Sequence, residues 1–521
     1  MRLVPAALAC WCVTAAGIWW PVGRIAALCC GGMAAAAGAL AWHAARRPGG
    51  GDRLRAVSAG LLAIGVVGAG FGFAVALRAD AVSRHPITAQ FGTVAPVTVT
   101  PTESAVPLGS GRLMFRATLQ RLRDAQMSGR VVVFARATDF GSEAGGVMVG
   151  QPVRFNARVS RPTRRDLTVA VLNASGRPIA GTAAPIQRAA HYVRSRFAAA
   201  ARDTLPTEQA AMLPALVLGD TSAVPAETGR DFRVAGMTHL MAVSGANVTI
   251  VCAAVLFSAR LIGPRAAVAL AALTLVAFVI VVQPTASVLR AAVMGAIALA
   301  GMLSSRRRQA IPGLAATVLV LLAIAPQLAV DVGFALSVIA TAALVVVAPV
   351  WSRRLVAKGC PKPLADAIAV AWAAHVVTAP LVAGISGRVS LVAAGANLAA
   401  APVIAPITVL GTAAAMLCVL WPAGAQLLIR FTGPELWWVL HVSRWSAGVP
   451  VATVPVPAGV PGVVLVACLA LLMLLLWGRR WFRIVIALGA VIMAVCSVAW
   501  SLSQLLDPAA ASSVGRDTIV E

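Results

Sequence analysis

The chain has 521 residues, of which 60% are hydrophobic and 12% charged. This balance excludes a set of soluble globular domains, whose charged fraction is about twice as high. Apolar stretches of about 18 residues or more recur from the N-terminus to near residue 505, and each is long enough to cross the roughly 30 Å hydrocarbon core of a bilayer as a helix. The sequence therefore predicts a polytopic α-helical membrane protein.

The formal net charge is +25, and because Lys358 and Lys362 are the only lysines, 41 of the 43 basic side chains are arginines. An excess of this size predicts a polyanionic partner, either lipid headgroups or nucleic acid. The nine cysteines lie nearly all inside apolar runs, so we interpret them as small apolar packing residues rather than a disulfide framework.

Residues 1–78 are predicted to be N-terminal membrane helices, with apolar runs at about 4–20, 25–43 and 56–78. The first run resembles a secretory signal, but a second apolar run follows at once, which indicates a retained span. Four arginines at 46, 47, 53 and 55 separate the second and third runs and mark a cytoplasmic loop. The third span therefore delivers the following segment to the outside.

Residues 79–235 form the one sizeable water-facing segment, predicted to be extracytoplasmic, and its first part, 79–180, is predicted to be a β domain. Apolar residues at 153, 155, 157 and 159 alternate with polar ones, the period of a strand with one buried face. Similar runs lie at about 94–100, 112–119, 130–137 and 167–172. Five short strands suit a small barrel of the oligonucleotide-binding (OB) type, although the pattern alone does not choose among small all-β folds.

The β domain is strongly basic, with eleven arginines against three acidic residues between positions 110 and 165. Such a surface can follow a phosphate backbone, or it can be a solvated face near anionic lipid. The candidate DNA-binding residues are Arg154, Arg158, Arg161, Arg164 and Arg165. Few aromatic residues accompany the charge (Phe115, Phe134, Phe140 and Phe155), so a base-stacking surface has weak support.

Residues 181–235 are predicted to be an amphipathic helical connector. Between Pro185 and Thr204, Ile186, Ala190, Val193 and Phe197 recur at helical spacing, and Arg188, Arg194, Arg196 and Arg202 lie off that stripe. A helix of this kind lies on the membrane surface or caps the domain.

Residues 236–505 are predicted to be the transmembrane channel domain, followed by a short tail at 506–521. Basic clusters fall on alternate loops, as one cytoplasmic side requires. We predict about 11–13 spans for the whole chain, with the N-terminus inside the cell. If there are thirteen spans, Glu521 lies outside. Two segments leave the number of spans open. Pro402 and Pro406 interrupt the run 390–420, which we interpret as re-entrant or as two half-helices. The segment 434–448 is polar and aromatic, so it either spans the membrane or lies along its interface. The predicted spans are 236–258, 267–283, 287–303, 311–330, 332–350, 366–384, 390–420, 434–448, 459–477 and 482–503.

Polar residues inside apolar spans cost free energy in the bilayer, so each is a candidate functional residue. On one continuous helix, Thr238, Met241, Gly245 and Val248 would share a side, with Ser244 and Asn247 three residues apart; this pattern fits a tight helix crossing or a pore-lining segment. Arg290 is predicted either to snorkel or to pair with Asp331. The channel candidates are His239, Ser244, Gly245, Asn247, Arg290, Asp331 and Asn397.

Neither metal-ligand spacing among the six histidines nor a phosphate-binding Gly-Lys-Ser/Thr loop occurs in the sequence. No catalytic residue, metal or cofactor is predicted, and the chain is not expected to be its own ATP motor.

The segment Gly236–Val248, preceded by Leu218-Gly219-Asp220 and by Arg230-Asp231-Phe232-Arg233, resembles the signature of the ComEC competence-protein family, the membrane channel for DNA uptake. Residues 287–294, 331–337 and 390–397 are similar to its later blocks, in the family's order. The resemblance covers about residues 205–480 and implies an extracytoplasmic OB-type domain before the channel. Many members also carry a C-terminal metallo-β-lactamase-like nuclease domain, but only residues 501–521, without histidine, follow the last predicted span. We therefore expect a shortened member, or one whose nuclease is a separate chain. The disulfide of some such binding domains is not expected, because no cysteine lies between Cys30 and Cys252.

The leading hypothesis is a non-enzymatic multi-pass channel of the cell membrane that passes one DNA strand inward. The resemblance implies single-stranded DNA, membrane lipid, a separate DNA receptor and a cytoplasmic ATPase as partners, and the oligomeric state stays open. One alternative is an intramembrane hydrolase using Ser244 with His239 or His375, which is disfavoured because His239 and Ser244 would be five residues apart on one helix. Another is a small-molecule exporter with an extracytoplasmic regulatory domain.

Overall fold

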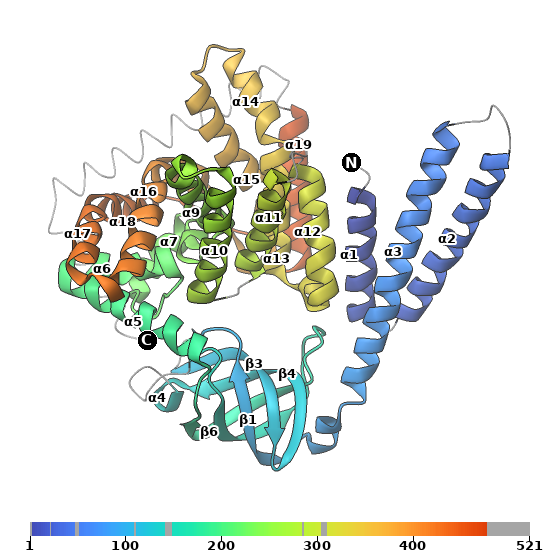
Figure 1. Ribbon diagram of the computed structural model, residues 1–521, viewed down its shortest axis with the longest axis horizontal. Coiled ribbons are helices and arrows are strands. Elements are labelled where there is room, and N and C mark those ends of the chain that lie inside the picture. Colours follow the sequence, from blue (N-terminus) through green and yellow to red (C-terminus); the bar gives the residue numbers. More distant parts are fainter. Residues whose placement is uncertain are drawn as a thin grey trace. The chain divides into compact units, whose positions relative to one another are not determined.

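The computed structural model describes residues 3–20, 22–46, 52–108, 111–140, 148–283, 286–303 and 310–476. The chain forms two compact units. The first contains Met1–Ala223, Leu240–Val345 and Ala405–Gly433, and the second contains Val224–His239, Val346–Ile404 and the described residues from Pro434 onward. Helices dominate both units, and one β domain lies in the first (Figure 1).

The β domain is a closed five-stranded barrel. Its strands are β1 (Val94–Pro101), β3 (Arg112–Leu122), β4 (Ala125–Arg136), β5 (Val153–Ser160) and β6 (Ala170–Ala180), with the short β2 (Val106–Pro107) and helix α4 (Ala137–Phe140) beside them. Strand β1 pairs with both β3 and β5, β3 pairs with β4, and β5 pairs with β6, all antiparallel. The parallel pair β4–β6 closes the ring. This circular order is that of an OB-type barrel, so the predicted fold class is confirmed.

The strand alternation explains why the barrel closes around an apolar core. Along β5, Val153, Phe155, Ala157 and Val159 are buried, whereas Arg154 and Arg158 between them are exposed. Strands β1, β3 and β4 alternate in the same way. Because side chains of a strand point to opposite faces in turn, all five strands place one apolar set inside and one polar set outside.

Three helices open the first unit: α1 (Leu3–Trp19), α2 (Gly23–Arg46) and α3 (Asp52–Ser83). Helices α2 and α3 approach closely at Gly65, where an added Cβ would lie 2.7 Å from the backbone nitrogen of Ala34. Small residues permit such close crossings of membrane helices. Helix α1 contacts the later helices through Trp11, whose ring lies 5.1 Å from that of Phe334 and whose Nε1 donates to the carbonyl of Ala329 (2.8 Å).

Among the described residues, eight further helices and three single turns belong to the first unit. They are α5 (Pro185–Thr204), α6 (Thr207–Leu218), α9 (Gly245–Ser258), α10 (Pro264–Val282), α11 (Ala286–Leu303), α12 (Ala310–Ile324), α13 (Val332–Val346) and α17 (Pro422–Phe431), with single turns η1 (Pro86–Gln90), η3 (Ala259–Leu261) and η4 (Pro326–Val330).

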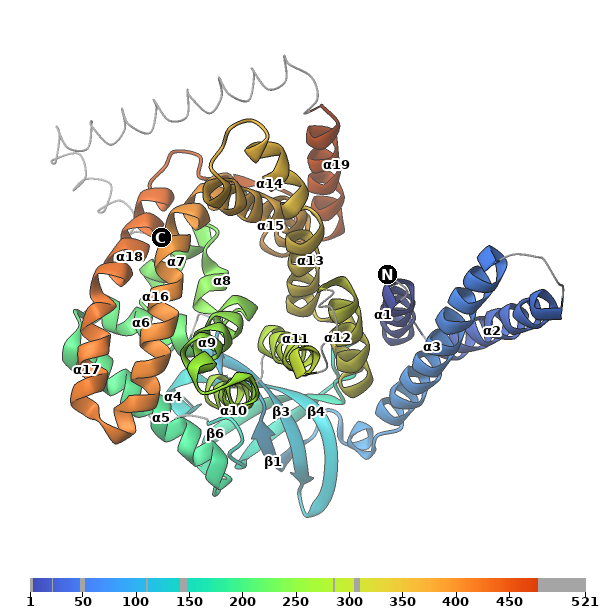
Figure 2. The same cartoon turned by 45° about the horizontal axis from the view of Figure 1, so that its top comes forward.

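The second unit contains α7 (Ala226–Val234), α14 (Ala348–Val356), α15 (Lys362–Ser386), α19 (Val460–Leu476), the paired strands β7 (Arg388–Ser390) and β8 (Thr453–Pro455), and α18 (Gly433–Ala447) from Pro434 onward. Helix α8 (Thr238–Met241) is divided between the two units. Figure 2 shows α14, α15 and α19 gathered together. Helix α16 (Ala393–Leu420) contributes residues to both units.

The protein is a multi-pass membrane protein. Six helices of the described chain are long and apolar enough to cross a bilayer: Gly23–Ala44, Leu54–Gln90, Pro264–Val282, Val332–Val356, Lys362–Ser386 and Ala393–Leu420. Five shorter apolar helices accompany them. The predicted span 482–503, the tail 506–521 and the arginines at 306–308 lie outside the described residues.

Two sequence predictions about helix continuity are wrong. The run 390–420 is neither re-entrant nor two half-helices, because α16 is one helix through Pro402 and Pro406. Within a membrane, side chains and neighbouring helices can satisfy the carbonyls that proline frees, which is why proline is tolerated there. Conversely, the predicted single span 236–258 is divided into α8 and α9.

Candidate functional site

Helix α9 begins inside the segment that the sequence predicted to be continuous. Ser244 is the N-cap of α9 and has extended backbone angles (φ −94°, ψ 163°), so the helical register of α8 does not carry over to α9. Thr238 and Met241 therefore do not share a helix face with Gly245 and Val248. For the same reason, His239 and Ser244 are not five residues apart on one helix, contrary to the prediction.

Ser244 and Asn247 hold this break in a fixed geometry. The Ser244 hydroxyl donates to Oδ1 of Asn247 (3.2 Å), and Nδ2 of Asn247 donates to the carbonyl of Leu216 at the end of α6 (2.9 Å). Asn247 is only 4% exposed. A buried amide bonded on both sides fixes its neighbours, because breaking either bond leaves a polar group unsatisfied.

The residues Leu218-Gly219-Asp220 anchor the same region. Gly219 ends α6 with a left-handed backbone (φ 70°) and lies against Val243. Arg194 of α5, 8% exposed, donates from Nη1 to the carbonyls of Leu218 (3.0 Å) and Val281 (3.2 Å), and its Nη2 lies 3.7 Å from Oδ2 of Asp220. Burial lowers the pKa of Arg194 and Asp220 opposes that effect. The prediction that Arg194 lies on the polar side of its helix is wrong, since it binds the negative C-terminal ends of α6 and α10.

Arg290 of α11 lies at the N-terminus of α9. Its Nε donates to the hydroxyl of Ser337 on α13 (2.7 Å), and Ser337 lies 3.1 Å from the hydroxyl of Ser287. A Cβ added to Gly245 would lie 2.7 Å from Nη2 of Arg290, so the guanidinium touches the first turn of α9. Arg290 is 6% exposed. A guanidinium and a helix N-terminus are both positive, so together they favour an anion.

Asp331 has a different role from the predicted one. Its Oδ1 accepts from the backbone N–H of Phe334 (2.8 Å), which caps the start of α13, and its Oδ2 lies 3.7 Å from Nη1 of Arg116 on the barrel. The ion pairs found among the described residues do not join Asp331 to Arg290. Asp331 therefore connects the barrel to the membrane helices instead of balancing the intramembrane arginine.

Two further hydrogen bonds join the barrel to helix ends. Ser104 Oγ donates to Oε1 of Gln283 just after α10 (2.7 Å), and Arg165 Nη1 donates to the carbonyl of Trp19 at the end of α1 (2.6 Å). The ends of α1 and α10 and the start of α13 thus meet the barrel. Because α3 and α10 run toward the barrel, Arg55 and Arg265 at their beginnings lie at the opposite ends of these helices.

The barrel face at this junction contains Arg116 and Arg130. Burial alone would lower the pKa of Arg116, but Glu103, at 3.1 Å, with Asp331 and Asp166 raises it above the usual value. Burial and the charge of Arg116 lower the pKa of Arg130, against the same three carboxylates. The junction is thus a mixed-charge network, whereas the outer surface is mainly basic.

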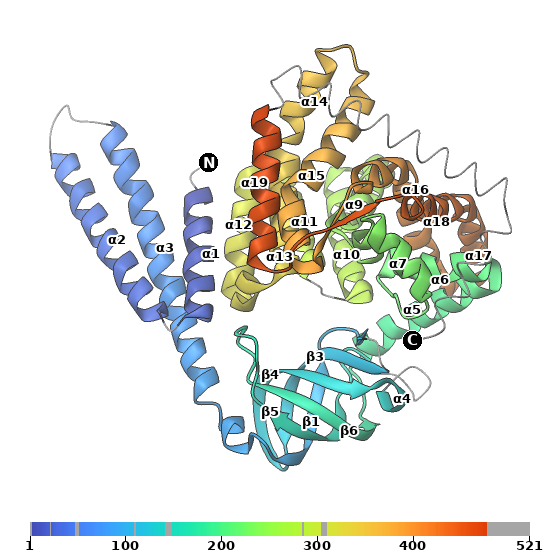
Figure 3. The ribbon, with the colours of Figure 1, turned by 180° about the vertical axis from the view of Figure 1, so that it is seen from behind.

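The five predicted DNA-binding arginines are all exposed. Arg154 and Arg158 project from β5. The Thr98 position of β1 pairs with Arg154 on one side and with Arg121 of β3 on the other, so these two arginines lie on one line across three strands. Figure 3 shows β5, β1 and β3 in the barrel. Arg161 stacks its guanidinium 5.7 Å from the ring of Phe91. Arg164 is exposed next to Arg165, whose Nη1 donates a hydrogen bond to the backbone carbonyl of Trp19.

The phenylalanines of the barrel do not form a base-stacking surface. Phe115, Phe140 and Phe155 are at most 4% exposed in the core, and Phe134 lies under the guanidinium of Arg112 at 5.5 Å. The outer surface therefore offers charge and hydrogen-bond donors, which suit a phosphate backbone rather than base recognition.

In the second unit, the side chain of Asn397 bonds two backbone carbonyls. Its Nδ2 donates to the carbonyls of Ala393 (2.8 Å) and Gly236 (3.3 Å), and Ser390 Oγ donates to the carbonyl of Val234 (2.7 Å). Gly236 has φ 67° and contacts Ala393, so a side chain at this position would clash. His239 is exposed on α8, and His375 is half-buried on α15.

Three residues of the candidate site, Ser337, Ser287 and Arg194, are not predicted from the sequence. Ser287 and Ser337 stand in the segments that carry the family resemblance, yet nothing in the sequence places two serines opposite one arginine. The position of Arg121 is not predicted either, because only strand register places it in line with Arg154, one strand apart. In the part of the chain that the structure describes, no three His, Cys, Asp or Glu side chains gather in a way that could hold a metal ion.

Together these features define a polytopic membrane protein with a basic OB-type barrel fastened to one end of its helices. Residues 216–481, just over half of the chain, match the family described as competence protein, and the chain belongs to that family. No curated protein and no solved structure matches the chain. Membership of this family supports a role in DNA uptake.

Proposed function

We propose that the protein is a channel that receives DNA on its barrel and conducts one strand between its membrane helices. The observation that carries the proposal is the arrangement along α13. This helix starts at the ion pair between Asp331 and Arg116 of the barrel and carries Ser337, the partner of Arg290, six residues later. Six residues of helix span about 9 Å, so a strand leaving the barrel reaches the Arg290 site within a short distance.

The barrel supplies binding without base selection. Its exposed arginines neutralise phosphates, and binding of this kind is strongly salt-dependent and nearly indifferent to sequence. An uptake channel needs this property, since the incoming sequence is arbitrary.

The Arg290 site supplies a favourable position for one phosphate within the membrane. The guanidinium is held by Ser337, and the adjacent N–H groups of α9 begin at Gly245. Conduction requires binding that is strong enough for entry and weak enough for release. A single positive site at a helix N-terminus binds one phosphate and releases it again, whereas a long basic groove would hold many phosphates at once and slow release.

The proposed direction follows from charge. Arg55 and Arg265 lie at the ends of α3 and α10 that face away from the barrel, and arginine-rich ends face the cytoplasm. We therefore place the barrel outside the cytoplasmic membrane. The sequence contains no phosphate-binding loop, so a separate cytoplasmic ATPase would drive transport, and a separate receptor would deliver the DNA.

The test is labelled-DNA import in cells that lack this protein and are complemented with variants. Arg290→Gln should lower import roughly tenfold or more, because one charge-assisted hydrogen bond contributes about 1.5–3 kcal/mol. DNA bound at the cell surface should stay unchanged, since the barrel is intact. Arg265→Gln, an exposed arginine at the start of α10, is the matched control.

Membrane abundance of each variant is measured in parallel. Import at the level of the Arg265→Gln control, with equal abundance, would remove Arg290 from the proposed path. Loss of both surface binding and import would instead show that the substitution disturbs the barrel junction.

A further inference from the structure

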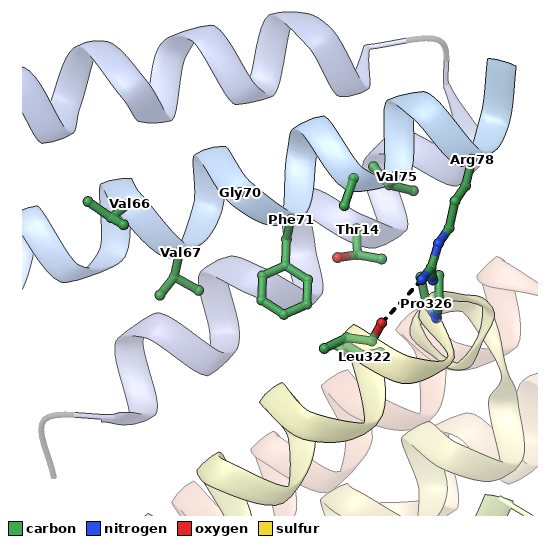
Figure 4. Close-up of a pocket in the computed structure, with 11 residues that line it drawn as sticks. Thr14, Val66, Val67, Gly70, Phe71, Val75, Arg78, Leu322 and Pro326 are labelled. Atoms are coloured by element: carbon green, nitrogen blue, oxygen red, sulfur yellow. Dashed lines mark hydrogen bonds between the residues drawn. The ribbon is translucent and has the colours of Figure 1, made fainter.

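An apolar cavity of about 250 Å³ lies between α1, α3 and α12. Figure 4 shows Val67, Phe71 and Arg78 projecting from α3 toward Leu322 and Pro326. Apart from Thr14 and Arg78, its lining is apolar: Val66, Val67, Gly70, Phe71, Ala74, Val75, Leu322, Ala323 and Pro326. The cavity lies beside a direct apolar contact of α1 and α3 with α12, in which Cys10 and Val75 pack in one cluster with Leu322.

Arg78 marks the polar end of this cavity. It is exposed, and its Nη2 donates to the carbonyl of Ala323 near the end of α12 (3.3 Å). Two residues later on α3, Asp80 forms an ion pair with Arg24 of α2. The exposed Trp19 and Trp20 end α1, and the carbonyl of Trp19 is bonded to the barrel. Charged and tryptophan side chains gather where membrane meets water, so Arg78 lies at headgroup level.

The length of the cavity matches one leaflet. Its lining on α3 runs from Val66 to Arg78, which is about 18 Å at the rise of an α-helix. One leaflet contributes about half of the roughly 30 Å hydrocarbon core. An apolar cavity of that length and of about 250 Å³ accommodates part of one acyl chain, and the cation at its outer end complements an anionic headgroup.

We propose that this cavity binds one phospholipid of the barrel-side leaflet, with an acyl chain against Phe71 and the headgroup phosphate at Arg78. The apolar lining excludes a polar occupant, and the position of the cation selects a lipid with an anionic group at the interface. The proposal is independent of the DNA channel, because it concerns how the N-terminal helices are joined to the bundle.

Gly70 allows a clean test. It lines the cavity, and a Cβ added there meets no atom within 4 Å, so Gly70→Leu fills the cavity without displacing protein. Gly60 on the same helix is equally open but does not line the cavity, which makes Gly60→Leu the matched control. The full-length protein is placed in liposomes with phosphatidylglycerol that carries a photoreactive group midway along one chain, and labelled peptides are mapped by mass spectrometry.

Wild-type protein should be labelled on residues 66–75 of α3 and near Leu322. Gly70→Leu should reduce that label roughly tenfold, since excluding about two methylene groups weakens binding by about that factor, whereas Gly60→Leu should match wild type. Equal labelling of the two variants would overturn the proposal. So would crosslinks between two protein copies through a cysteine at Val67, because these would assign the cavity to a second copy of the chain.

The headgroup is tested with Arg78→Gln against Arg84→Gln, an exposed arginine at the end of the same segment. Arg78→Gln alone should lower phosphatidylglycerol labelling about fivefold, the effect of one arginine near an anionic surface. A diacylglycerol probe, which lacks phosphate, should label both variants equally. A parallel fall with both probes would exclude Arg78 as the phosphate partner.

Discussion

The polar side chains on the outer face of the barrel are solvated by water, whereas those at the break before α9 are hydrogen-bonded to other protein groups. On the barrel, Arg154 and Arg158 face water between buried neighbours. At α9, by contrast, Ser244 is bonded to Asn247, Asn247 to Leu216, and Arg290 to Ser337. Water solvates the first set, so each arginine can act alone. In the membrane the protein itself must satisfy each group. The second set therefore forms two groups of hydrogen bonds, which come close to each other at Gly245.

This contrast predicts different responses to substitution. Removing the barrel arginines one at a time should weaken DNA binding in graded steps. At the α9 site, a substitution that disturbs the geometry should strongly reduce DNA import, whereas the loss of one peripheral hydrogen bond should be tolerated. Additive effects are expected for separated residues and non-additive ones for residues in contact.

The largest effect is expected from Gly245→Leu. An added Cβ at Gly245 would lie 2.7 Å from Nη2 of Arg290 and 3.3 Å from the Cβ of Ala291. The guanidinium must therefore move away from the first turn of α9. Such overpacking typically costs about 1–3 kcal/mol, and DNA import should fall roughly tenfold or more because the anion position is lost as well.

The matched control is Gly301→Leu on α11, where an added Cβ meets nothing within 4 Å. Import and membrane abundance are measured for both variants. If Gly245→Leu imports DNA as well as Gly301→Leu does, the close approach of Arg290 to α9 has no functional role.

An intermediate, graded effect is expected on the barrel. Replacing Arg154, Arg158 and Arg161 together by Gln in the purified full-length protein should reduce the log–log salt slope of single-stranded DNA binding by about 2, at roughly 0.7 for each phosphate contact. Single substitutions should give about one third of that change. Gln at Arg46, Arg55 and Arg260 is the control, and an equal slope for both triple variants would assign the barrel arginines to lipid or folding.

The sequence predicted the barrel better than the membrane site, and the reason is physical. In β5 a single period of two decides both the strand and its buried face, because water lies on one side and the core on the other. Inside the bilayer both sides of a helix are apolar, so hydrophobicity does not reveal where a helix ends. The interruption before Gly245 has one local signal, a serine at an N-cap position, and the apolar run around it obscured that signal.

Two further differences depend on contacts that only the fold creates. Arg194 looked like a solvent-facing residue of an amphipathic helix, yet it lies where the C-terminal carbonyls of α6 and α10 converge. Asp331 was correctly singled out as a polar residue at the start of a span, but its partner is Arg116 on a different domain. A pattern along one chain segment does not contain the identity of a neighbour more than two hundred residues away.

The smallest effect is expected from Ser244→Ala, and this variant separates a packing role from a catalytic one. The substitution keeps the small volume and removes only the hydrogen bond to Oδ1 of Asn247, while the bond from Asn247 to Leu216 remains. A single hydrogen bond of this kind, here within the first turn of one helix, contributes about 1 kcal/mol, so import should stay within about fivefold of wild type. A nucleophilic serine would behave in the opposite way, because its loss typically removes several powers of ten in rate. Import measured at equal membrane abundance decides between them. Abolished import in Ser244→Ala alongside normal import in Gly245→Leu would make the intramembrane hydrolase the better hypothesis, since the order of the two effects would then follow chemistry at Ser244 rather than the geometry around Arg290.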